Sequence, residues 1–448
     1  MGLTDLILFP MYTLALYFLF GLTRRKTNDP LLKKYHGQGF WIKVFSAAAF
    51  TFFNVYISPG DSYGLYYVEG TNIAHLISSD LSNISWWFTP GTNFDQSLLA
   101  NPLNAGYFMS ESNYFICKLV SFFSFLSFSN YLLINLFFSL IAFSGSWRLF
   151  KFFYEQHPQL HKQFAIAILY LPTFVFWSSG ILKDSVCIAM LGYVTYSIYN
   201  VLILKTGVIK YTVLAIISGY VIAVVKSYIL ISYLPFFMLY LLLNNVKLIR
   251  KTSTKMTLLL SFFIITIIGF VSFSGRLQEA MGGLAIDQLT ETVKKQQDLF
   301  INISDAAESS FSLGVEFDGS NGSLVRMAPA AVAATLFRPY LWESKKLSTL
   351  LSSLESLALM LFTLYVFFKA GPLHFFLSVF KDPLVMFCFF FSIVFALFVG
   401  ATTLNFGTLV RYKIPCMPFY IISMVLIREI SKKRKTALSL KKAIPPIS

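Results

Sequence analysis

Apolar residues gather along this chain in runs that are long enough, or nearly long enough, to cross a membrane as helices. A helix needs roughly 20 such residues to span a hydrocarbon layer about 30 Å thick. About eleven runs meet or approach this length, namely residues 3–22, 40–58, 129–147, 164–180, 185–204, 211–226, 227–245, 256–275, 348–368, 384–400 and 414–427. The pattern predicts an all-α integral membrane protein with about eleven transmembrane helices.

Composition points to the same class. Hydrophobic residues make up 56% of the 448 residues and charged residues 13%, and the mean hydropathy is +0.66. A water-soluble globular protein of this length is excluded. We therefore treat residues 1–448 as a single polytopic membrane domain. The four cysteines are scattered without metal-ligand spacing, which favours small packing residues.

Basic residues predict the orientation, because Lys and Arg are retained on the cytoplasmic side. They cluster in residues 23–39, 246–255 and the basic tail 428–448. Eleven spans then place the N-terminus outside and the C-terminus in the cytoplasm. The net charge of +15 is explained by these clusters facing anionic membrane lipids, without a nucleic-acid partner. The first span lacks a basic leader and is expected to remain as a helix. The 49 phenylalanines and short loops suggest a multi-pass protein of a bacterial cytoplasmic (inner) membrane.

Two segments outside the predicted spans are long enough to be structured outer loops, residues 59–128 and 276–347. Between Val44 and Cys117 the chain has no Lys or Arg but five acidic residues, as expected of a translocated segment. The second loop contains a Ser/Gly/Asp-rich stretch, 304–323, that reads either as a lid or as a plain connector.

Polar residues at the outer rim are candidates for chemistry, because ionisable groups at a bilayer boundary are costly unless they are paired or hydrated. The first cluster follows span 40–58 directly and contains Asp61, Tyr63, Tyr66, Glu69 and His75. Asp61 and Glu69 share a face if residues 62–78 are helical. Asp61 could act as a general base or hold a divalent metal, or simply cap the following helix.

The second cluster lies at the midpoint of a 41-residue apolar stretch, 164–204, which is twice the length of one span. The turn of a helical hairpin is expected there, at Trp177, Lys183 and Asp184. These residues either form an ordinary surface ion pair or take part in function.

The third cluster lies just before the predicted span 348–368, and the fourth lies between the last two predicted spans. Arg338, Trp342 and Glu343 suit either an interfacial belt or a phosphate site with an aromatic lip. Asn405, Arg411 and Lys413 lie in the last predicted outer loop. Five basic residues violate the positive-inside trend: Lys183, Lys226, Arg338, Arg411 and Lys413. A lipid-linked phosphate or diphosphate at the outer rim would account for them.

The order of these motifs resembles that of bacterial multi-spanning GT-C-type glycosyltransferases and related polysaccharide polymerases. The likeness covers residues 59–418 and is carried by four short motifs, Gly-Asp-Ser-Tyr, Trp-Ser-Ser-Gly-x-x-Lys-Asp, Arg-Pro-x-x-Trp-Glu and Asn-Phe-Gly-Thr-x-x-Arg-Tyr-Lys-x-Pro. The resemblance implies a polyprenyl-phosphate-linked sugar donor and an acidic residue of the first outer loop at the reaction centre, here Asp61. Basic residues of the later loops would contact phosphate. The family's usual paired aspartates are absent.

The sequence hypothesis is therefore glycosyl transfer at the outer face of the membrane, in envelope or exopolysaccharide assembly. Asp61, with Asp184 and Glu69 as alternatives, would deprotonate a glycan or lipid acceptor. Lys183, Arg338, Arg411 and Lys413 would stabilise the departing phosphate. The acceptor pocket would be lined by Tyr63, Tyr66, His75, Trp177, Trp342, Glu343 and Asn405. No cofactor is required; a divalent metal is left open, but the sequence offers no ligand set for it.

Two other functions fit the same pattern. A lipid-linked saccharide transporter or flippase would also need basic rim residues, together with charges inside its spans. A non-enzymatic membrane subunit of an envelope-assembly or secretion complex would use the outer loops to dock protein partners. In that case the four clusters need not converge.

Overall fold

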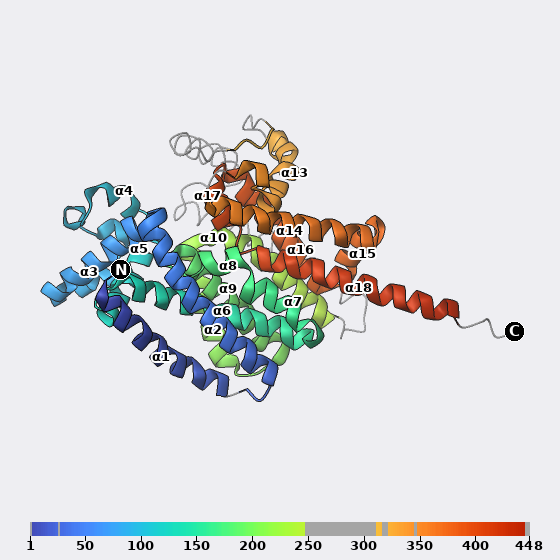
Figure 1. Ribbon diagram of the computed structural model, residues 1–448, viewed down its shortest axis with the longest axis horizontal. Helices are drawn as coiled ribbons and strands as arrows, with labels where there is room; N and C mark the ends of the chain where they lie inside the picture. The colour runs from blue at the N-terminus through green and yellow to red at the C-terminus, as the bar shows by residue number, and fades with distance from the viewer. Residues whose placement is uncertain (1, 26, 247–310, 316–320, 345–346, 444–448) are drawn as a thin grey trace. The chain divides into compact units, whose positions relative to one another are not determined.

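The computed structural model describes residues 2–25, 27–246, 311–315, 321–344 and 347–443 (Figure 1). The described residues are almost entirely helical and contain no β-strand. They divide into two compact units, Met1–Leu230 and Ile231–Ser448. The predicted span 256–275 and most of the second outer loop lie outside the described residues.

The first unit is built from ten helices and several short helical turns. Its α-helices are α1 Leu3–Arg25, α2 Pro30–Phe52, α3 Val68–Ser79, α4 Ala105–Phe108, α5 Glu111–Ser127, α6 Tyr131–Gln156, α7 His161–Ala165, α8 Pro172–Trp177, α9 Lys183–Tyr199 and the first part of α10 Val208–Val246. Wider π-helical turns follow or join them at Phe53–Ile57, Ser62–Tyr67, Ile166–Tyr170 and Asn200–Leu204. Short 3₁₀ turns occupy Leu81–Trp87, Gly91–Asn93, Gln96–Leu98, Pro102–Asn104 and Pro158–Leu160.

The second unit contains the remainder of α10 and six further described helices. These are α13 Asn321–Phe337, α14 Leu347–Ala370, α15 Pro372–Lys381, α16 Pro383–Thr402, α17 Phe406–Tyr412 and α18 Met417–Ala443, with a 3₁₀ turn at Leu341–Glu343. Its core is rich in aromatic rings. Tyr233 of α10 packs edge-on against Phe387 and Phe391 of α16, with ring centroids 5.3 and 5.1 Å away. Edge-to-face packing of this kind is the favoured arrangement of aromatic pairs.

Among the described residues, seven helices are long and apolar enough to cross a membrane, or eight if one bent pair counts as a single span. The seven are Thr4–Arg25, Pro30–Ile57, Tyr131–Gln156, Lys183–Leu204, Val208–Asn244, Thr349–Ala370 and Pro383–Thr402. The bent pair is Phe406–Tyr412 with Met417–Ala437, at 63°. This confirms the predicted class of all-α membrane protein, whereas the predicted orientation of the termini stays a prediction.

Several predicted span boundaries were wrong. The helix predicted to begin at residue 40 begins at Pro30, because Asp29 caps it through the backbone N–H groups of Leu31 and Leu32. Residues 164–180 do not form one continuous helix, since the chain breaks at Leu171 before Pro172. The predicted spans 211–226 and 227–245 are joined in α10, with one non-helical residue, Lys226, at their boundary.

Glycines allow the central helices of the first unit to pack closely. A Cβ atom on Gly192 of α9 would lie only 1.9 Å from the carbonyl oxygen of Gly145 on α6. Small residues at helix contacts are typical of membrane proteins, where close backbone approach replaces the hydrophobic effect as the source of helix association. By contrast α1 is almost uncovered, with only 6% of its apolar window buried within the protein.

The first unit has two chemically different ends. Near the start of α1, Asn130 donates to Asp5 at 2.6 Å and Tyr12 donates to the carbonyl of Leu126 at 2.6 Å. The N-terminal end of α1 therefore lies beside the 59–128 segment. The opposite end of α1 carries Arg24, which approaches Gly37 of α2. Within this unit the predicted outer loop and the first basic cluster thus lie at opposite ends of the helices, as a transmembrane arrangement requires.

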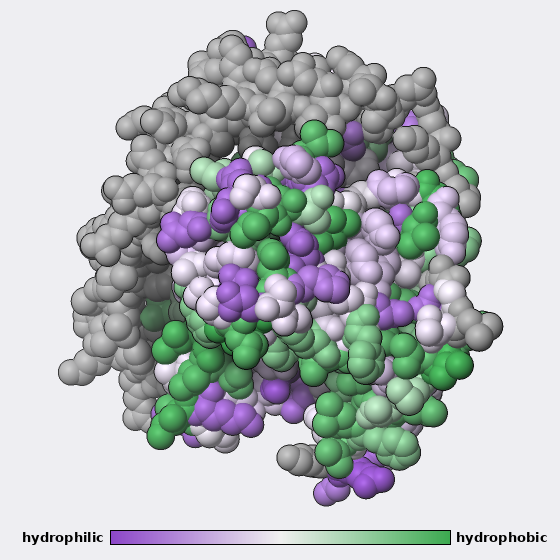
Figure 2. Space-filling model, turned by 90° about the vertical axis from the view of Figure 1, so that its left-hand side faces the viewer, coloured by the Kyte–Doolittle hydropathy of each residue, from purple (hydrophilic) through white to green (hydrophobic). Residues whose placement is uncertain are grey.

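Figure 2 shows the face that carries α3 and α4, where hydrophilic and hydrophobic residues are intermingled. Large apolar side chains of the 59–128 segment are exposed. The exposed fractions of Leu81, Phe88 and Leu103 are 75%, 82% and 84%. A segment of this composition suits a membrane-proximal surface better than open solvent.

Candidate functional site

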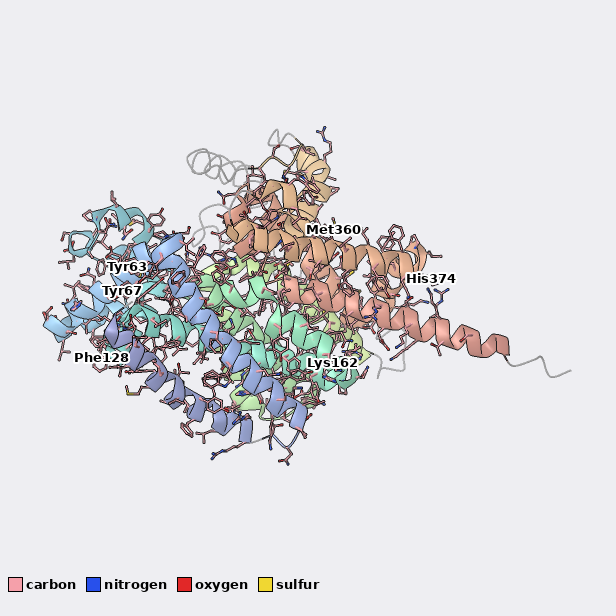
Figure 3. The ribbon with its side chains drawn as sticks, in the orientation of Figure 1. Tyr63, Tyr67, Phe128, Lys162, Met360 and His374 are labelled. Carbon is pink, nitrogen blue, oxygen red and sulfur yellow. The ribbon has the colours of Figure 1, made fainter. Side chains whose placement is uncertain are left out.

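Asp61 lies at the N-cap position of the π-helical turn Ser62–Tyr67, but its side chain makes no capping hydrogen bond. Its side chain is exposed, whereas Glu69 is fully buried. Asp61 therefore occupies the cap position that the sequence offered as an alternative, but it does not make the capping hydrogen bond. Beside it, the rings of Tyr63 and Tyr67 pack together with centroids 5.1 Å apart. Figure 3 labels both side chains. His75 is exposed on α3.

Glu69 anchors the first loop. Its carboxylate accepts hydrogen bonds from the backbone N–H groups of Ala100 and Asn101, at 3.0 and 2.9 Å, and from the amide of Asn104 at 2.8 Å. Three donors around a fully buried carboxylate compensate for its loss of hydration. The geometry gives Glu69 a structural role in holding residues 100–104 against α3. Tyr66, also buried, donates to Asn113 at 3.1 Å.

The Trp-Ser-Ser-Gly segment leads into a buried turn between α8 and α9, at the place where the sequence predicts the turn of a helical hairpin. We refer to residues 178–182 as the buried turn. All five residues are buried, and three of them, Ser178, Ser179 and Ile181, have no measurable exposure. Trp177, at the end of α8, packs edge-on against Phe50 of α2.

Lys43 of α2 holds this turn in place. Its ammonium donates to the carbonyls of Val175 and Ser178, at 3.2 and 3.0 Å, and to the hydroxyls of Ser178 and Ser179, at 2.6 and 3.2 Å. The lysine is 3% exposed. A cation near the last carbonyls of a helix complements their partial negative charge.

Asn135 and Gly180 complete the turn. The side chain of Asn135 on α6 accepts the N–H of Ile181 at 2.8 Å and donates to Thr51 of α2 at 2.9 Å. Gly180 lies against the ring of Phe50, and a Cβ atom there would come within 1.9 Å of that ring. Sequence reasoning missed Lys43 and Asn135. The available signal was that Lys43 is a lone lysine inside an apolar run.

Lys183 and Asp184 begin α9 and make separate contacts. Lys183 reaches the hydroxyl of Ser112 at 2.7 Å, and therefore connects the buried turn to the start of α5. Asp184 is fully buried and forms an ion pair with Lys226 at 2.5 Å. The sequence left open an ordinary surface ion pair between neighbouring Lys183 and Asp184; Asp184 is instead buried and pairs with Lys226 of α10.

The first two clusters approach each other around Cys117 of α5. Burial raises the pKa of the Cys117 thiol; the charge of Glu69 raises the pKa further, whereas Lys183 lowers it. Both charged groups are therefore close enough to act on the same thiol. The structure thus places residues of the 59–128 segment beside residues of the buried turn.

Arg338 is the centre of a second cluster, in the second unit. Its guanidinium forms a bidentate ion pair with Glu343 and donates to the carbonyl of Ser312 at 2.8 Å. The guanidinium carbon lies 4.4 Å from the ring centroid of Phe311 and 5.3 Å from that of Phe406. These two rings are stacked, with centroids 4.6 Å apart. Aromatic faces stabilise a cation held over them.

The last two sequence clusters meet in this unit. Lys413 is buried and donates to the carbonyl of Arg338 at 3.0 Å and to the hydroxyl of Ser356 at 2.9 Å. Asn405 caps α17 by accepting the N–H of Thr408 at 3.2 Å. Arg338, Glu343, Asn405 and Lys413, which the sequence places in two separate clusters, therefore lie in one neighbourhood around α17.

Arg411 and Trp342 lie at the margin of that neighbourhood. The guanidinium carbon of Arg411 is 5.8 Å from the ring centroid of its neighbour Tyr412. Trp342 is 81% exposed and stacks on Tyr340 with centroids 4.9 Å apart. An exposed, stacked indole is typical of a residue that anchors at a membrane interface.

Within the described parts of the chain, no three His, Cys, Asp or Glu side chains come together in a way that could hold a metal ion. The fold and these clusters define a multi-spanning α-helical membrane protein with charged groups buried among its helices. Comparisons with protein-family models, curated proteins and solved structures give no match for this chain.

Proposed function

We propose that the protein is a membrane glycosyltransferase that uses a polyprenyl-phosphate-linked sugar donor. The observation that carries the proposal is the excess of positive charge around the buried turn of the first unit. Three lysines, Lys43, Lys183 and Lys226, surround or adjoin this turn, where Asp184 is the acidic partner of one of them. Such an excess suits a phosphate or diphosphate, since ammonium groups stabilise its charge as the sugar departs.

Asp61 is the carboxylate best suited to act as general base. Glu69 and Asp184 are fully buried and are already engaged by three donors and by Lys226, respectively. Asp61, by contrast, is an exposed residue of the 59–128 segment. It is close in sequence to Tyr63, whose ring could stack on a sugar ring. In this proposal Asp61 removes the proton of the acceptor hydroxyl, and that oxygen attacks the anomeric carbon as the lipid phosphate leaves.

The phosphate would be bound by half-buried Lys183. In the second unit, Arg338 and Lys413 offer a second set of donors, with Phe311 and Phe406 as an apolar wall. Because Glu343 already occupies Arg338 in a bidentate manner, a phosphate would have to displace that carboxylate. Lys183 is therefore the more accessible candidate, and Arg411 a peripheral one.

The proposal places the reaction at the outer face of a bacterial cytoplasmic membrane, with a glycan or lipid as acceptor. The lack of positive charge in the described part of residues 44–117 supports that side. Envelope or exopolysaccharide assembly would be the corresponding process.

The test is sugar transfer by purified full-length protein from a panel of radiolabelled polyprenyl-phosphate sugars. Asp61→Asn should lower the rate by about 100-fold or more, as expected when a general base is removed. Lys183→Ala should lower it as well. Asp95→Asn is the matched control, because Asp95 is an exposed carboxylate in the same segment that accepts hydrogen bonds from the backbone N–H and the hydroxyl of Ser97. Undiminished transfer by Asp61→Asn would remove Asp61 from the mechanism, and absence of transfer from every donor would reject the proposal.

A transporter of the same lipid-linked saccharide is the second candidate, and the buried charges favour it. Lys43, Asp184 and Lys226 all lie inside apolar segments, where a transporter keeps its polar groups. An assay in detergent distinguishes the two functions. An enzyme transfers sugar without a sealed compartment, whereas transport is measurable only across the bilayer of a closed vesicle.

A further inference from the structure

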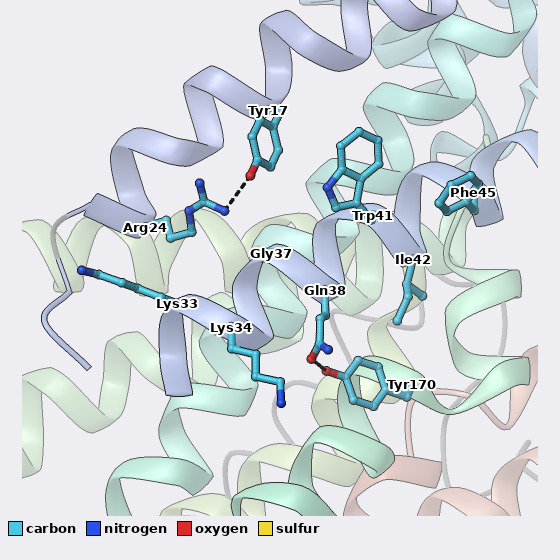
Figure 4. A pocket seen from close by; sticks show the side chains of 10 residues that line it. All are labelled: Tyr17, Arg24, Lys33, Lys34, Gly37, Gln38, Trp41, Ile42, Phe45 and Tyr170. Carbon is cyan, nitrogen blue, oxygen red and sulfur yellow. Dashed lines mark hydrogen bonds between the residues drawn. The ribbon is translucent and has the colours of Figure 1, made fainter. Parts of the chain in front are cut away.

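A groove at the basic end of the first unit has the chemistry of a phospholipid site. It has a volume of about 680 Å³ and lies between α1, α2 and Tyr170 (Figure 4). One end carries Arg24, Lys33 and Lys34, and no acidic side chain lines it. The other end is apolar and includes Trp41 and Phe45.

Arg24 is fixed at the groove. Its Nη1 donates to the hydroxyl of Tyr17 at 2.8 Å, and its guanidinium carbon lies 5.0 Å from the centroid of the same ring. Gly37 makes room for it, because a Cβ atom there would lie 3.3 Å from Nη1. Tyr17 thereby holds the guanidinium in position, and this contact adds no negative charge next to it.

The positive charge of the groove is not neutralised within the described part of the protein. None of Arg24, Lys33 and Lys34 has a carboxylate within 4.0 Å there. The nearest acid in the sequence, Asp29, is engaged elsewhere, by the first N–H groups of α2 and by the hydroxyl of Tyr154. Both lysines are exposed. The three cations therefore remain available to an anion.

The length of the groove matches one leaflet. Lys34, Gln38, Trp41 and Phe45 follow one another at spacings of four, three and four residues, and so lie along one face of α2. From Lys34 to Phe45 the helix rises about 16 Å, close to half of a hydrocarbon layer about 30 Å thick. A phosphate held at Lys34 would thus have its acyl chains beside Trp41 and Phe45.

The groove is also accessible from the membrane. Its α1 wall belongs to the least buried of the seven described helices that could cross a membrane, and Phe45 is 69% exposed. Trp41 is 38% exposed and lies between the charged and apolar ends, where its amphipathic indole is favoured. A soluble phosphate compound would leave this apolar wall uncovered.

We infer that this groove binds one anionic phospholipid, with its phosphate at Arg24, Lys33 and Lys34 and its acyl chains along Trp41 and Phe45. The site is separate from the groups proposed for sugar transfer, which lie around the buried turn and around Arg338. Basic pockets between helices at the cytoplasmic side are a known way of binding acidic headgroups.

The test is quenching of Trp41 fluorescence by brominated phospholipid in vesicles containing the full-length protein. The Trp41→Phe protein provides the background signal of the other tryptophans. Brominated phosphatidylglycerol should quench Trp41 at a lower mole fraction than brominated phosphatidylcholine. Replacing Arg24, Lys33 and Lys34 together by Gln should weaken this preference by about tenfold or more.

The matched control removes three other exposed lysines, Lys162→Gln, Lys205→Gln and Lys210→Gln, for the same change of net charge. This control variant should keep the preference for brominated phosphatidylglycerol over brominated phosphatidylcholine. Equal loss in both triple variants would show diffuse surface attraction and overturn the inference, as would equal quenching by the two lipids. Displacement of the brominated lipid by millimolar glycerol phosphate would also overturn it, because the occupant would then be a soluble phosphate. Thermal denaturation of each variant verifies that it is folded.

Discussion

Lys226 and Asp184 form a buried ion pair, with Nζ and Oδ1 2.5 Å apart and side-chain exposures of 6% and 0%. Lys226 is also the one non-helical residue inside α10, with φ −153° and ψ 75°. The pair therefore joins the start of α9 to the interruption of α10. A buried charge of either sign is costly without its partner, so the two residues depend on each other.

Removing one member of this pair should destabilise the protein more than removing both. Lys226→Met removes the ion-pair partner of the fully buried carboxylate of Asp184, at a cost of about 3–5 kcal/mol. The double variant Asp184→Leu, Lys226→Met should recover much of that loss. Thermal denaturation in detergent measures the three proteins, and a double variant as unstable as the sum of the single variants would contradict the coupling.

Gly180→Ala should disturb the buried turn. The added methyl group would overlap the ring of Phe50, and overpacking of this kind costs about 1–3 kcal/mol. Gly219→Ala is the matched control, because a Cβ atom at Gly219 would meet nothing within 4 Å. The comparison uses melting temperatures. Combining Gly180→Ala with Phe50→Leu should restore stability if the clash with the ring is the cause.

Glu69→Gln should loosen the first loop. The substitution turns an amide N–H₂ toward the donors of residues 100–104, and a hydrogen bond to a charged group contributes about 1.5–3 kcal/mol. Faster amide exchange at Ala100 and Asn101, and faster proteolysis nearby, are expected. Asp95→Asn should leave both rates unchanged. Unaltered exchange in Glu69→Gln would show that the loop is held by other contacts.

Tyr154→Phe should lower stability at neutral pH and have little effect in acid. The hydroxyl of Tyr154 donates to Asp29, and this bond is the main cause that lowers the pKa of Asp29 below 3.8. A carboxyl whose folded pKa is depressed contributes fully above its unfolded pKa, and the contribution disappears as the pH falls through the folded pKa. The difference in melting temperature between the two proteins should therefore be largest above about pH 5 and shrink below about pH 4. A difference that does not depend on pH would mean that Tyr154 acts through packing.

Much of the fold was readable from the sequence. Apolar runs predicted the membrane class, and most of the described spans lie where the runs do, because a helix in lipid must satisfy its own backbone hydrogen bonds and present apolar side chains. The boundaries at Pro30 and Leu171 were misjudged. The Asp29 cap sets the first boundary and Pro172 sets the second, and a hydropathy pattern detects neither feature.

The candidate site was readable only in part. Sequence reasoning found Lys183, Asp184, Arg338 and Lys413 as unusual charges, because each interrupts an apolar context. It could not find contacts between residues that are far apart in the sequence. Asp184 meets Lys226, 42 positions away, and Lys43 meets Ser178, 135 positions away. No local pattern encodes such distances.

The amino-acid sequence by itself determined that this chain is a helical membrane protein whose basic residues cluster in residues 23–39, 246–255 and 428–448, since hydropathy and charge act through composition and local order. Only the tertiary structure decided that the Trp-Ser-Ser-Gly segment is a buried turn held by Lys43, and that Glu69 anchors a loop. Those roles arise when helices from distant parts of the chain pack together, because a buried polar group must then be satisfied by whichever partner the packing brings within hydrogen-bonding distance.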